Sequence, residues 1–273
     1  MQATQQTVLV TGASSGIGEA IAKALQADGH VVYAAARRTE RLAHLQELGI
    51  HTISLDVSDE SSIQSALQTI KSQAGNITVL INNAGYGSYG SLEEVPLEEG
   101  RRQMEVNLFG LARLMQLATP DMRQAGDGYI INISSMGSRF GEPFGAWYHA
   151  SKYAVEGLTD SVRMELEPFG VKVVNVQPGI IQSEWGNIAA ENLEKNSAQG
   201  PYAEAAQRKA KSLRSLFTSS LSSPPEVIAT KIVSIIHNRR PAFRYVVGGS
   251  ASPILLLRRF TSDRFFYTML NRR

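Results

Sequence analysis

The sequence contains no cysteine among its 273 residues. Disulfide bonds, thiolate nucleophiles and cysteine-ligated metal sites are therefore excluded together. Histidine is scarce as well, and its spacing is not typical of metal ligands; the five are His30, His44, His51, His149 and His237. We therefore expect a cytoplasmic protein that holds no metal.

A large charge excess and a long apolar run are also missing. The chain carries 27 Lys and Arg against 25 Asp and Glu, a formal net charge of +2, and no basic block interleaved with aromatic residues. Nucleic acid is therefore not expected as a partner. No uninterrupted apolar stretch approaches the roughly 20 residues that cross a bilayer, and the run that begins at Thr7 follows no segment typical of a signal peptide. We expect a soluble protein, or one that at most contacts a membrane surface.

Short runs rich in β-branched residues alternate with helical patterns along the chain. Near-continuous apolar strands of this kind are buried on both faces, and right-handed crossovers place helices on each side of the sheet. The sequence therefore predicts an α/β protein, a single domain over residues 1–273, with one doubly wound parallel sheet (a Rossmann fold) and helices on both faces. The expected strands span residues 7–11, 31–35, 51–55, 79–82, 129–133 and 171–177, with a last strand at 244–247.

A glycine-rich turn follows the first predicted strand. It reads Thr-Gly-Ala-Ser-Ser-Gly-Ile-Gly over residues 11–18, and a helical pattern opens directly after it. Glycines permit a tight turn and a close approach of the backbone, and the N–H groups of a helix N-terminus bind a pyrophosphate. A merely structural turn is the alternative. We predict that a dinucleotide is held here, by Gly12, Ser14, Ser15, Gly16, Ile17 and Gly18.

The end of the second predicted strand distinguishes the two nicotinamide dinucleotides. An acidic residue there would accept hydrogen bonds from a ribose 2′-hydroxyl, whereas this chain has Arg37 and Arg38. A guanidinium offers a fork of donors to a 2′-phosphate, and a charge-assisted hydrogen bond contributes roughly 1.5–3 kcal/mol. The pair therefore favours NADP(H) over NAD(H). The alternative is that these arginines cover a solvated helix face with Glu40 and Glu47.

Tyr148 and Lys152 are four residues apart. On a helix they share one face, with about 5–6 Å between their Cβ atoms. A free tyrosine titrates near 10, which is too high for acid–base work at neutral pH. A cation about 4 Å away contributes about 4 kcal/mol at an effective dielectric constant of 20. We therefore expect Lys152, together with an oxidised nicotinamide, to lower the pKa of Tyr148 by about two units.

These features occur together and in a fixed order. The glycine turn at 11–18 is followed by Asn-Asn-Ala-Gly at 82–85, then Asn107, Ser135 and the Tyr148-x-x-x-Lys152 pair. Over residues 7–181 the chain resembles the short-chain dehydrogenase/reductase family, whose glycine spacing it also has. Together with the stretch at 249–251, the motifs are similar to those of steroid and retinol dehydrogenases.

The resemblance implies an oxidoreductase that moves hydride between a nicotinamide and a ketone or secondary alcohol. It gives Tyr148 the role of general acid and base. Lys152 would also bind the nicotinamide ribose, and Ser135 would bind the substrate oxygen, with the neighbouring Ser134 as the alternative. Asn107 would hold a water in a proton relay; otherwise it is a helix-interior Asn bonded to its own backbone. An NADP(H)-binding regulatory protein without catalysis is the second hypothesis, which the intact Ser135, Tyr148 and Lys152 disfavour.

The resemblance also implies the remaining cofactor contacts. Asp56 would bind the adenine amino group and Val57 would cover the ring, although Asp56 could equally be a turn or helix-cap residue. The segment after the sixth strand would hold the nicotinamide carboxamide, with Ser183 where many relatives have Thr. The family further implies a homodimer or homotetramer. The other contacts of this set are Asn83, Ala84 and Gly85 beside the adenosine ribose, and Pro178, Gly179 and Ile181 beside the nicotinamide.

Two segments depart from the strand–helix alternation. Residues 183–223 are polar and rich in Ala, Lys and Glu, and we predict a helical flap that covers the substrate site. Residues 254–273 are apolar and basic. This tail packs on the core or on a sister subunit, or else it forms a wall of the substrate channel or contacts a membrane. Four aromatic residues are expected to line an apolar substrate pocket, unless they belong to the core; they are Tyr86, Phe140, Phe144 and Trp147.

Overall fold

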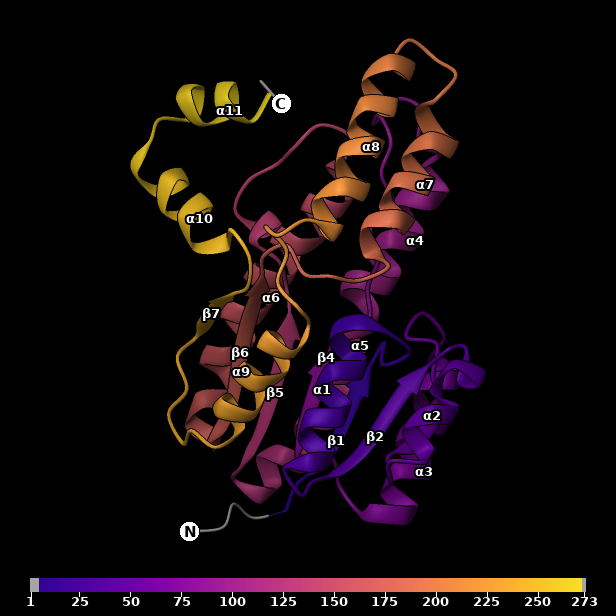
Figure 1. Cartoon of the computed structure of the whole chain (residues 1–273). Coiled ribbons are helices and arrows are strands. Elements are labelled where there is room, and N and C mark those ends of the chain that lie inside the picture. Colours follow the sequence, from indigo (N-terminus) through magenta and orange to yellow (C-terminus); the bar gives the residue numbers. More distant parts are fainter. Residues whose placement is uncertain (1–4, 272–273) are drawn as a thin grey trace.

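The computed structural model describes residues 5–271, with the backbone alone for residue 271. The ends of the predicted domain and tail, residues 1–4 and 272–273, lie outside the described residues. A seven-stranded sheet with the order β3-β2-β1-β4-β5-β6-β7 forms the centre of the molecule (Figure 1), and every neighbouring pair is parallel. The strands are β1 (Thr7–Thr11), β2 (Val31–Ala36), β3 (His51–Ser54), β4 (Val79–Asn82), β5 (Gly128–Ile133), β6 (Val171–Pro178) and β7 (Arg244–Val247).

The predicted doubly wound fold is confirmed, including the late strand β7. Each strand begins and ends within one residue of its expected bounds. The agreement follows from burial, because the runs that set the prediction are the sheet interior: Val8, Leu9 and Val10 in β1 and Val79, Leu80 and Ile81 in β4 are all fully buried.

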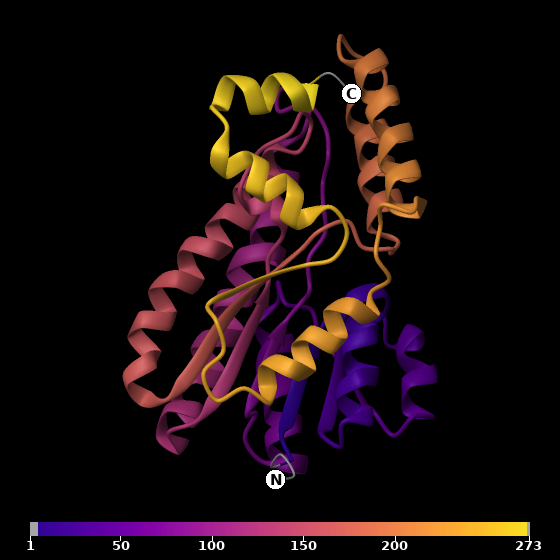
Figure 2. The same cartoon turned by 60° about the vertical axis from the view of Figure 1, so that its left-hand side comes forward.

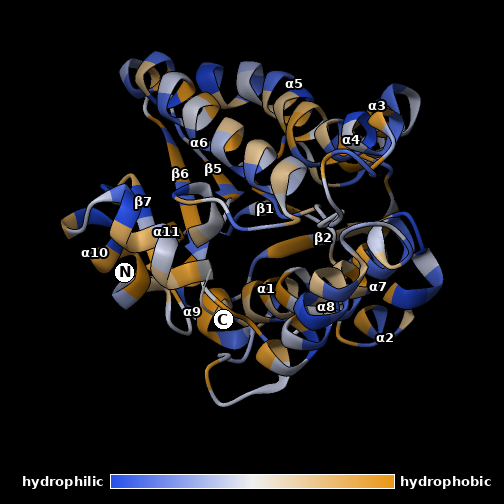
Figure 3. Ribbon diagram, turned by 90° about the horizontal axis from the view of Figure 1, so that it is seen from above, coloured by the Kyte–Doolittle hydropathy of each residue, from blue (hydrophilic) through white to orange (hydrophobic). Residues whose placement is uncertain are grey.

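Helices cover both faces of the sheet (Figure 3). One core cluster joins α1 (Gly16–Ala27), α2 (Ala43–Gln46) and α9 (Glu226–Ile236) to the sheet. The other joins α3 (Glu60–Ala74), α5 (Gly110–Ala125) and α6 (Ala146–Leu166) to the opposite face. The strand order reverses between β1 and β4, so the crossovers leave in opposite directions there and open a crevice at the carboxyl ends.

Two helices from the predicted flap rise beyond this end of the sheet (Figure 1, Figure 2). They are α7 (Trp185–Ser197) and α8 (Ala203–Thr218), which lie side by side. A bidentate ion pair between Arg214 and Glu194 joins them. The chain enters and leaves the flap at one point. There, Gln182 N donates to Ser223 O at 2.9 Å, and Ser223 N donates to Ile180 O at 2.9 Å.

The predicted tail forms α10 (Ala251–Phe260) and α11 (Asp263–Asn271). Phe266 is fully buried with its ring edge-on to Phe140, at 5.5 Å between centroids. Other apolar residues of the tail face outward, since Phe260 and Phe265 are 76% and 57% exposed. In the part of the chain that the structure describes, no helix is both long and apolar enough to span a membrane.

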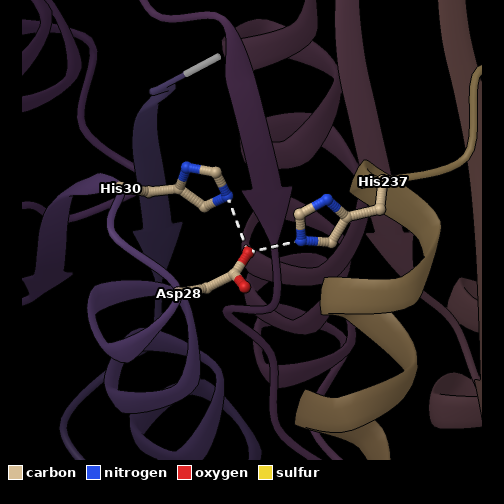
Figure 4. Close-up of side chains that lie close together, drawn as sticks. All are labelled: Asp28, His30 and His237. Carbon is tan, nitrogen blue, oxygen red and sulfur yellow. Dashed lines mark hydrogen bonds and ion pairs between the residues drawn. The ribbon is translucent and has the colours of Figure 1, made fainter. Parts of the chain in front are cut away.

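Asp28, His30 and His237 meet at the amino end of the sheet (Figure 4). The Asp28 carboxylate lies between the two rings, with Oδ2 3.1 Å from His30 Nε2 and 2.7 Å from His237 Nε2. The three ligand atoms lie within 4.8 Å of one another, as a metal site requires. The spacing of the histidines in the sequence did not indicate this group, because His237 follows α9 and lies far along the chain from Asp28 and His30. His30 Nδ1 accepts a hydrogen bond from Gln6 N–H at 3.3 Å, so a neutral His30 carries its proton on Nε2 and directs it toward Asp28.

This cluster predicts a pH dependence of stability. Burial lowers the pKa of His30; Asp28 opposes the shift and His237 adds to it. The unfolded chain therefore takes up a proton on His30 more readily than the folded protein does, so stability is lost as the pH falls below about 6.5. We expect urea melts of His30→Gln to lose less unfolding free energy between pH 7 and pH 5 than wild type, by up to ~1.4 kcal/mol per pH unit. Equal losses in the two proteins would contradict this role of His30.

Candidate active site

A single cavity occupies the crevice and extends under the flap. It collects most of the predicted site residues from the turns that follow the strands. Gly18 and Asn107 lie behind its wall rather than in it. The predicted residues that line it are Gly12, Ser14, Ser15, Gly16, Ile17, Arg37, Arg38, Asp56, Val57, Asn83, Ala84, Gly85, Ser135, Tyr148, Lys152, Pro178, Gly179, Ile181 and Ser183.

The glycine turn is packed too closely for side chains. Gly12 has φ +66°, and a Cβ there would lie 2.8 Å from Ala84 Cα. A Cβ on Gly18 would lie 2.4 Å from Gly12 O, so this glycine lets α1 approach the turn. Asn83 fastens the turn to the end of β4, because its Nδ2 donates to Thr11 O at 2.9 Å and to Gly12 O at 3.1 Å. The N-terminus of α1 at Gly16 thus faces the cavity, an arrangement that fits a pyrophosphate.

Arg37 and Arg38 project from the end of β2 as exposed side chains at the rim of the cavity. Within residues 5–271, neither guanidinium makes an ion pair with a carboxylate. Their exposure fits both a phosphate contact and the alternative of a solvated helix face. Arg41, one turn further on, is the arginine that pairs, with Glu184 at 2.9 Å. The guanidinium groups of Arg37 and Arg38 are therefore free to bind an anion.

Asp56 has the turn role considered for it, and its adenine contact stays a prediction. Its Oδ1 accepts hydrogen bonds from Ser58 N at 2.9 Å and from the Ser58 hydroxyl at 2.6 Å, which is the turn role. The residue also lines the cavity next to Val57, where an adenine would lie.

Tyr148, Ser135 and Lys152 converge at the inner end of the cavity. Tyr148 is 8% exposed, and Ser135 rather than Ser134 is the serine whose hydroxyl lowers the pKa of its phenol. Lys152, one turn along α6, donates from Nζ to Ile133 O at 2.9 Å. A hydroxyl, a phenol and an ammonium thus line the same cavity, and these are groups that can serve acid–base chemistry at a carbonyl.

The chain's own groups raise the pKa of Tyr148. Burial raises it to about 12; the hydrogen bond from Ser135 opposes the shift, and the Glu142 carboxylate adds to it. Burial likewise lowers the pKa of Lys152 to about 8, against the attraction of Glu156. With these groups alone, Tyr148 holds its proton at neutral pH. The lowering expected from Lys152 together with an oxidised nicotinamide stays a prediction.

Asn107 lies in a π-helical turn, residues 105–109, between α4 (Leu97–Met104) and α5. Its Oδ1 accepts from Tyr86 N at 3.0 Å, while its Nδ2 donates to Tyr86 O and Ser151 Oγ, each at 3.0 Å. The reading as an Asn bonded to its own helix backbone is therefore wrong. The turn points the amide toward the strand ends, and π-turns of this kind are frequent at functional sites.

The apolar part of the cavity comes mainly from the flap. Trp185 packs on Tyr148 with ring centroids 5.0 Å apart, and Phe217 packs on Trp185 at 5.2 Å. Tyr86 and Phe140 line the cavity as expected, but Phe144 and Trp147 do not. Trp147 faces away from the cavity because it fills the space left by Gly100 of α4, where a Cβ would lie 2.5 Å from its ring. Residues that sequence reasoning missed are Tyr89, Trp185, Ile188, Leu213, Leu216 and Phe217; the spacing of the last three, at i, i+3 and i+4 on α8, is the signal that could have indicated them.

Comparisons with known proteins agree with this geometry. Residues 6–194 match the model of a family described as short chain dehydrogenase. The chain is 36% identical over 245 residues to 3-ketodihydrosphingosine reductase of Bacteroides thetaiotaomicron, covering 89% of this chain and 88% of that protein. It is 34% identical over 250 residues to NADPH-dependent 3-dehydrocapnine reductase of Ornithobacterium rhinotracheale, covering 88% and 87%. A solved short-chain dehydrogenase from Streptomyces avermitilis superposes with a TM-score of 0.80 at 33% identity, covering 93% and 92% of the two chains.

The family match spans more than half of the chain, and the order of the motifs, the strand order and the crevice all point the same way. The resemblance inferred from the sequence is confirmed: this chain belongs to the short-chain dehydrogenase/reductase family of nicotinamide-dependent oxidoreductases.

Proposed function

We propose that the protein uses NADPH to reduce a ketone on a hydrophobic substrate, with Tyr148 as the general acid. The observation that carries this proposal is a buried, protonated Tyr148 that lines an apolar cavity together with Ser135 and Lys152. A protonated phenol can donate its proton to a ketone oxygen, which is the proton transfer that reduction requires.

Two free guanidiniums support the choice of cofactor. Arg37 and Arg38 stand at the rim where the 2′-phosphate of NADPH would lie, and the turn at Gly12 and Gly16 fits the pyrophosphate. The name of the relative from Ornithobacterium rhinotracheale also specifies NADPH.

The side chains then divide the chemistry among them. Ser135 would donate a hydrogen bond to the ketone oxygen and fix its position, and Tyr148 would transfer its phenolic proton to the same oxygen as the carbonyl becomes an alcohol. A bound NADPH would supply the hydride. The Lys152 ammonium would stabilise the resulting phenolate, and Asn107 would hold the π-turn and the Tyr86 backbone in place behind it.

The walls of the cavity support a hydrophobic substrate. The side chains under the flap that face Tyr148 are largely apolar, among them Trp185, Leu213 and Phe217. The relative from Bacteroides thetaiotaomicron is named for a keto lipid, 3-ketodihydrosphingosine. We therefore propose a ketone with a long apolar chain.

Initial rates with NADPH and NADH test the proposal, measured on a panel of long-chain, aromatic and small aliphatic ketones. We expect faster turnover with NADPH and a higher kcat/KM for long-chain ketones. Tight NADPH binding with no turnover on any ketone would instead favour the regulatory hypothesis.

Trp185→Ala tests the apolar wall. Loss of the buried part of an indole weakens the binding of a bulky substrate by about 1.5–3 kcal/mol, so we expect KM for long-chain ketones to rise at least about tenfold. KM for a small aliphatic ketone should change far less. Trp147→Ala is the matched control, because that indole packs on Gly100 outside the cavity. If both ketones respond equally to Trp185→Ala, the indole does not define the substrate pocket.

A further inference from the structure

One wall of the otherwise apolar region of the cavity carries a polar cluster: Tyr89, Glu142, His149 and Lys209. Glu142 is at its centre. Its Oε1 accepts a hydrogen bond from the Tyr89 hydroxyl at 3.3 Å, and its Oε2 pairs with Lys209 of α8. Tyr89 and His149 are 1% and 5% exposed, so the cluster is built into the protein rather than spread over its surface. The reaction steps described above use none of these four side chains.

His149 has an unsatisfied nitrogen that faces Glu142. Its Nδ1 lies 2.7 Å from the carbonyl oxygen of Gly137, so Nδ1 carries a proton and donates it. Burial lowers the pKa of His149, which keeps the ring neutral and leaves a lone pair on Nε2. Nε2 is buried without a hydrogen-bond partner and lies 3.8 Å from Glu142 Oε1. A carboxylate oxygen and an imidazole lone pair thus face one position, and a buried acceptor without a donor is costly.

This position is adjacent to the reaction centre. His149 directly follows Tyr148 on α6, and the Tyr89 and Tyr148 rings lie 6.0 Å apart. The charge of Glu142 contributes to the raised pKa of Tyr148, so the carboxylate lies within electrostatic reach of the phenol. A group bound between Glu142 and His149 therefore lies close to a carbonyl held by Ser135 and Tyr148.

We propose that Glu142 and His149 bind an ammonium group that the substrate carries next to its ketone. This inference rests on the proposed function and narrows its substrate to α-amino ketones. An ammonium has three N–H donors, enough to bond Glu142 Oε1 and His149 Nε2 together, and its charge suits a carboxylate better than a neutral donor does. Its positive charge would also offset the effect of Glu142 on Tyr148 and so assist proton transfer to the ketone.

Lys209 has a separate part in this arrangement. It pairs with the other carboxylate oxygen, Oε2, and ties α8 to the loop that carries Glu142. Oε1 accepts the hydrogen bond from Tyr89 and keeps a lone pair for a second donor. The competing explanation is that the Glu142–Lys209 pair only fastens the flap. The two explanations differ in whether the variants discriminate between substrates with and without an amine.

The test uses two ketones, an α-amino ketone with a long alkyl chain and the same ketone with hydrogen in place of the amine. The readout is the ratio of their kcat/KM values with NADPH. We expect wild type to prefer the amino ketone, and Glu142→Gln to lower the ratio by on the order of tenfold to hundredfold, because it removes one charge-assisted hydrogen bond. Lys209→Met should keep or raise the ratio, since it leaves the carboxylate unpaired. Glu98→Gln, an exposed carboxylate of α4, is the control.

Two outcomes overturn the inference. If Glu142→Gln and Lys209→Met lower kcat/KM for both ketones equally and leave the ratio unchanged, the Glu142–Lys209 pair only holds the flap in place. If wild type reduces the amine-free ketone as well as the amino ketone, the proposed function holds and the amine site does not. Should wild type reduce neither ketone, the proposed function fails, and titration of the protein–NADP⁺ complex decides the amine site. Quenching of tryptophan fluorescence by the amino ketone that is weaker in Glu142→Gln supports it, and equal quenching overturns it.

Discussion

Tyr148→Phe is expected to lower kcat for ketone reduction by about 10²–10⁴-fold, the contribution of a positioned general acid. The variant removes one oxygen and keeps the ring that packs on Trp185 at 5.0 Å and Tyr89 at 6.0 Å. The cavity should therefore keep its shape, and the Kd for NADPH should change little. Steady-state rates and a fluorescence titration with NADPH measure the two quantities.

Tyr153→Phe is the matched control for this variant. Tyr153 is on the same helix, five residues on, but it is 46% exposed and does not line the cavity. A Tyr148→Phe variant that keeps more than about a tenth of the wild-type kcat would show that another group delivers the proton.

Replacement of Arg37 and Arg38 by Ala is expected to reverse the cofactor preference. Each guanidinium that bonds a 2′-phosphate contributes roughly 1.5–3 kcal/mol, so kcat/KM for NADPH should fall by at least about a hundredfold. The value for NADH should change by less than about threefold, because that cofactor offers no phosphate at this position. Initial rates over a range of each cofactor give the comparison.

Arg41→Ala serves as the control, because Arg41 follows one turn further on and is engaged by Glu184 at 2.9 Å. A loss of the same size for NADPH and NADH in the double variant would mean that these arginines support the fold of the turn instead of reading the phosphate.

The elements that local sequence determines were predictable. Buried strands such as β1 and β4 show as apolar runs, and the turn at Gly12 shows in its glycines because only a residue without a Cβ fits beside Ala84. The convergence of Tyr148 and Lys152 follows from the repeat of a helix.

Features that depend on packing between distant segments were not predictable. Whether Trp147 or Trp185 faces the cavity depends on how α4 packs on α6, which Gly100 permits, and on where the flap lies. Likewise, the elevated pKa of Tyr148 comes from burial under residues far along the chain, and the Asp28 cluster needs His237 to return from α9. Periodicity shows which face of a segment is apolar but not which neighbour covers it.

The paired hydrogen bonds between residues 180–182 and Ser223 have an evolutionary consequence. Since these bonds join the two ends of the flap, the segment between them has a closed base. Relatives could exchange, lengthen or shorten this segment and so acquire new substrates, while the residues beneath it that serve hydride transfer stay the same. Recombination at these two points is therefore a natural route by which one scaffold diversifies.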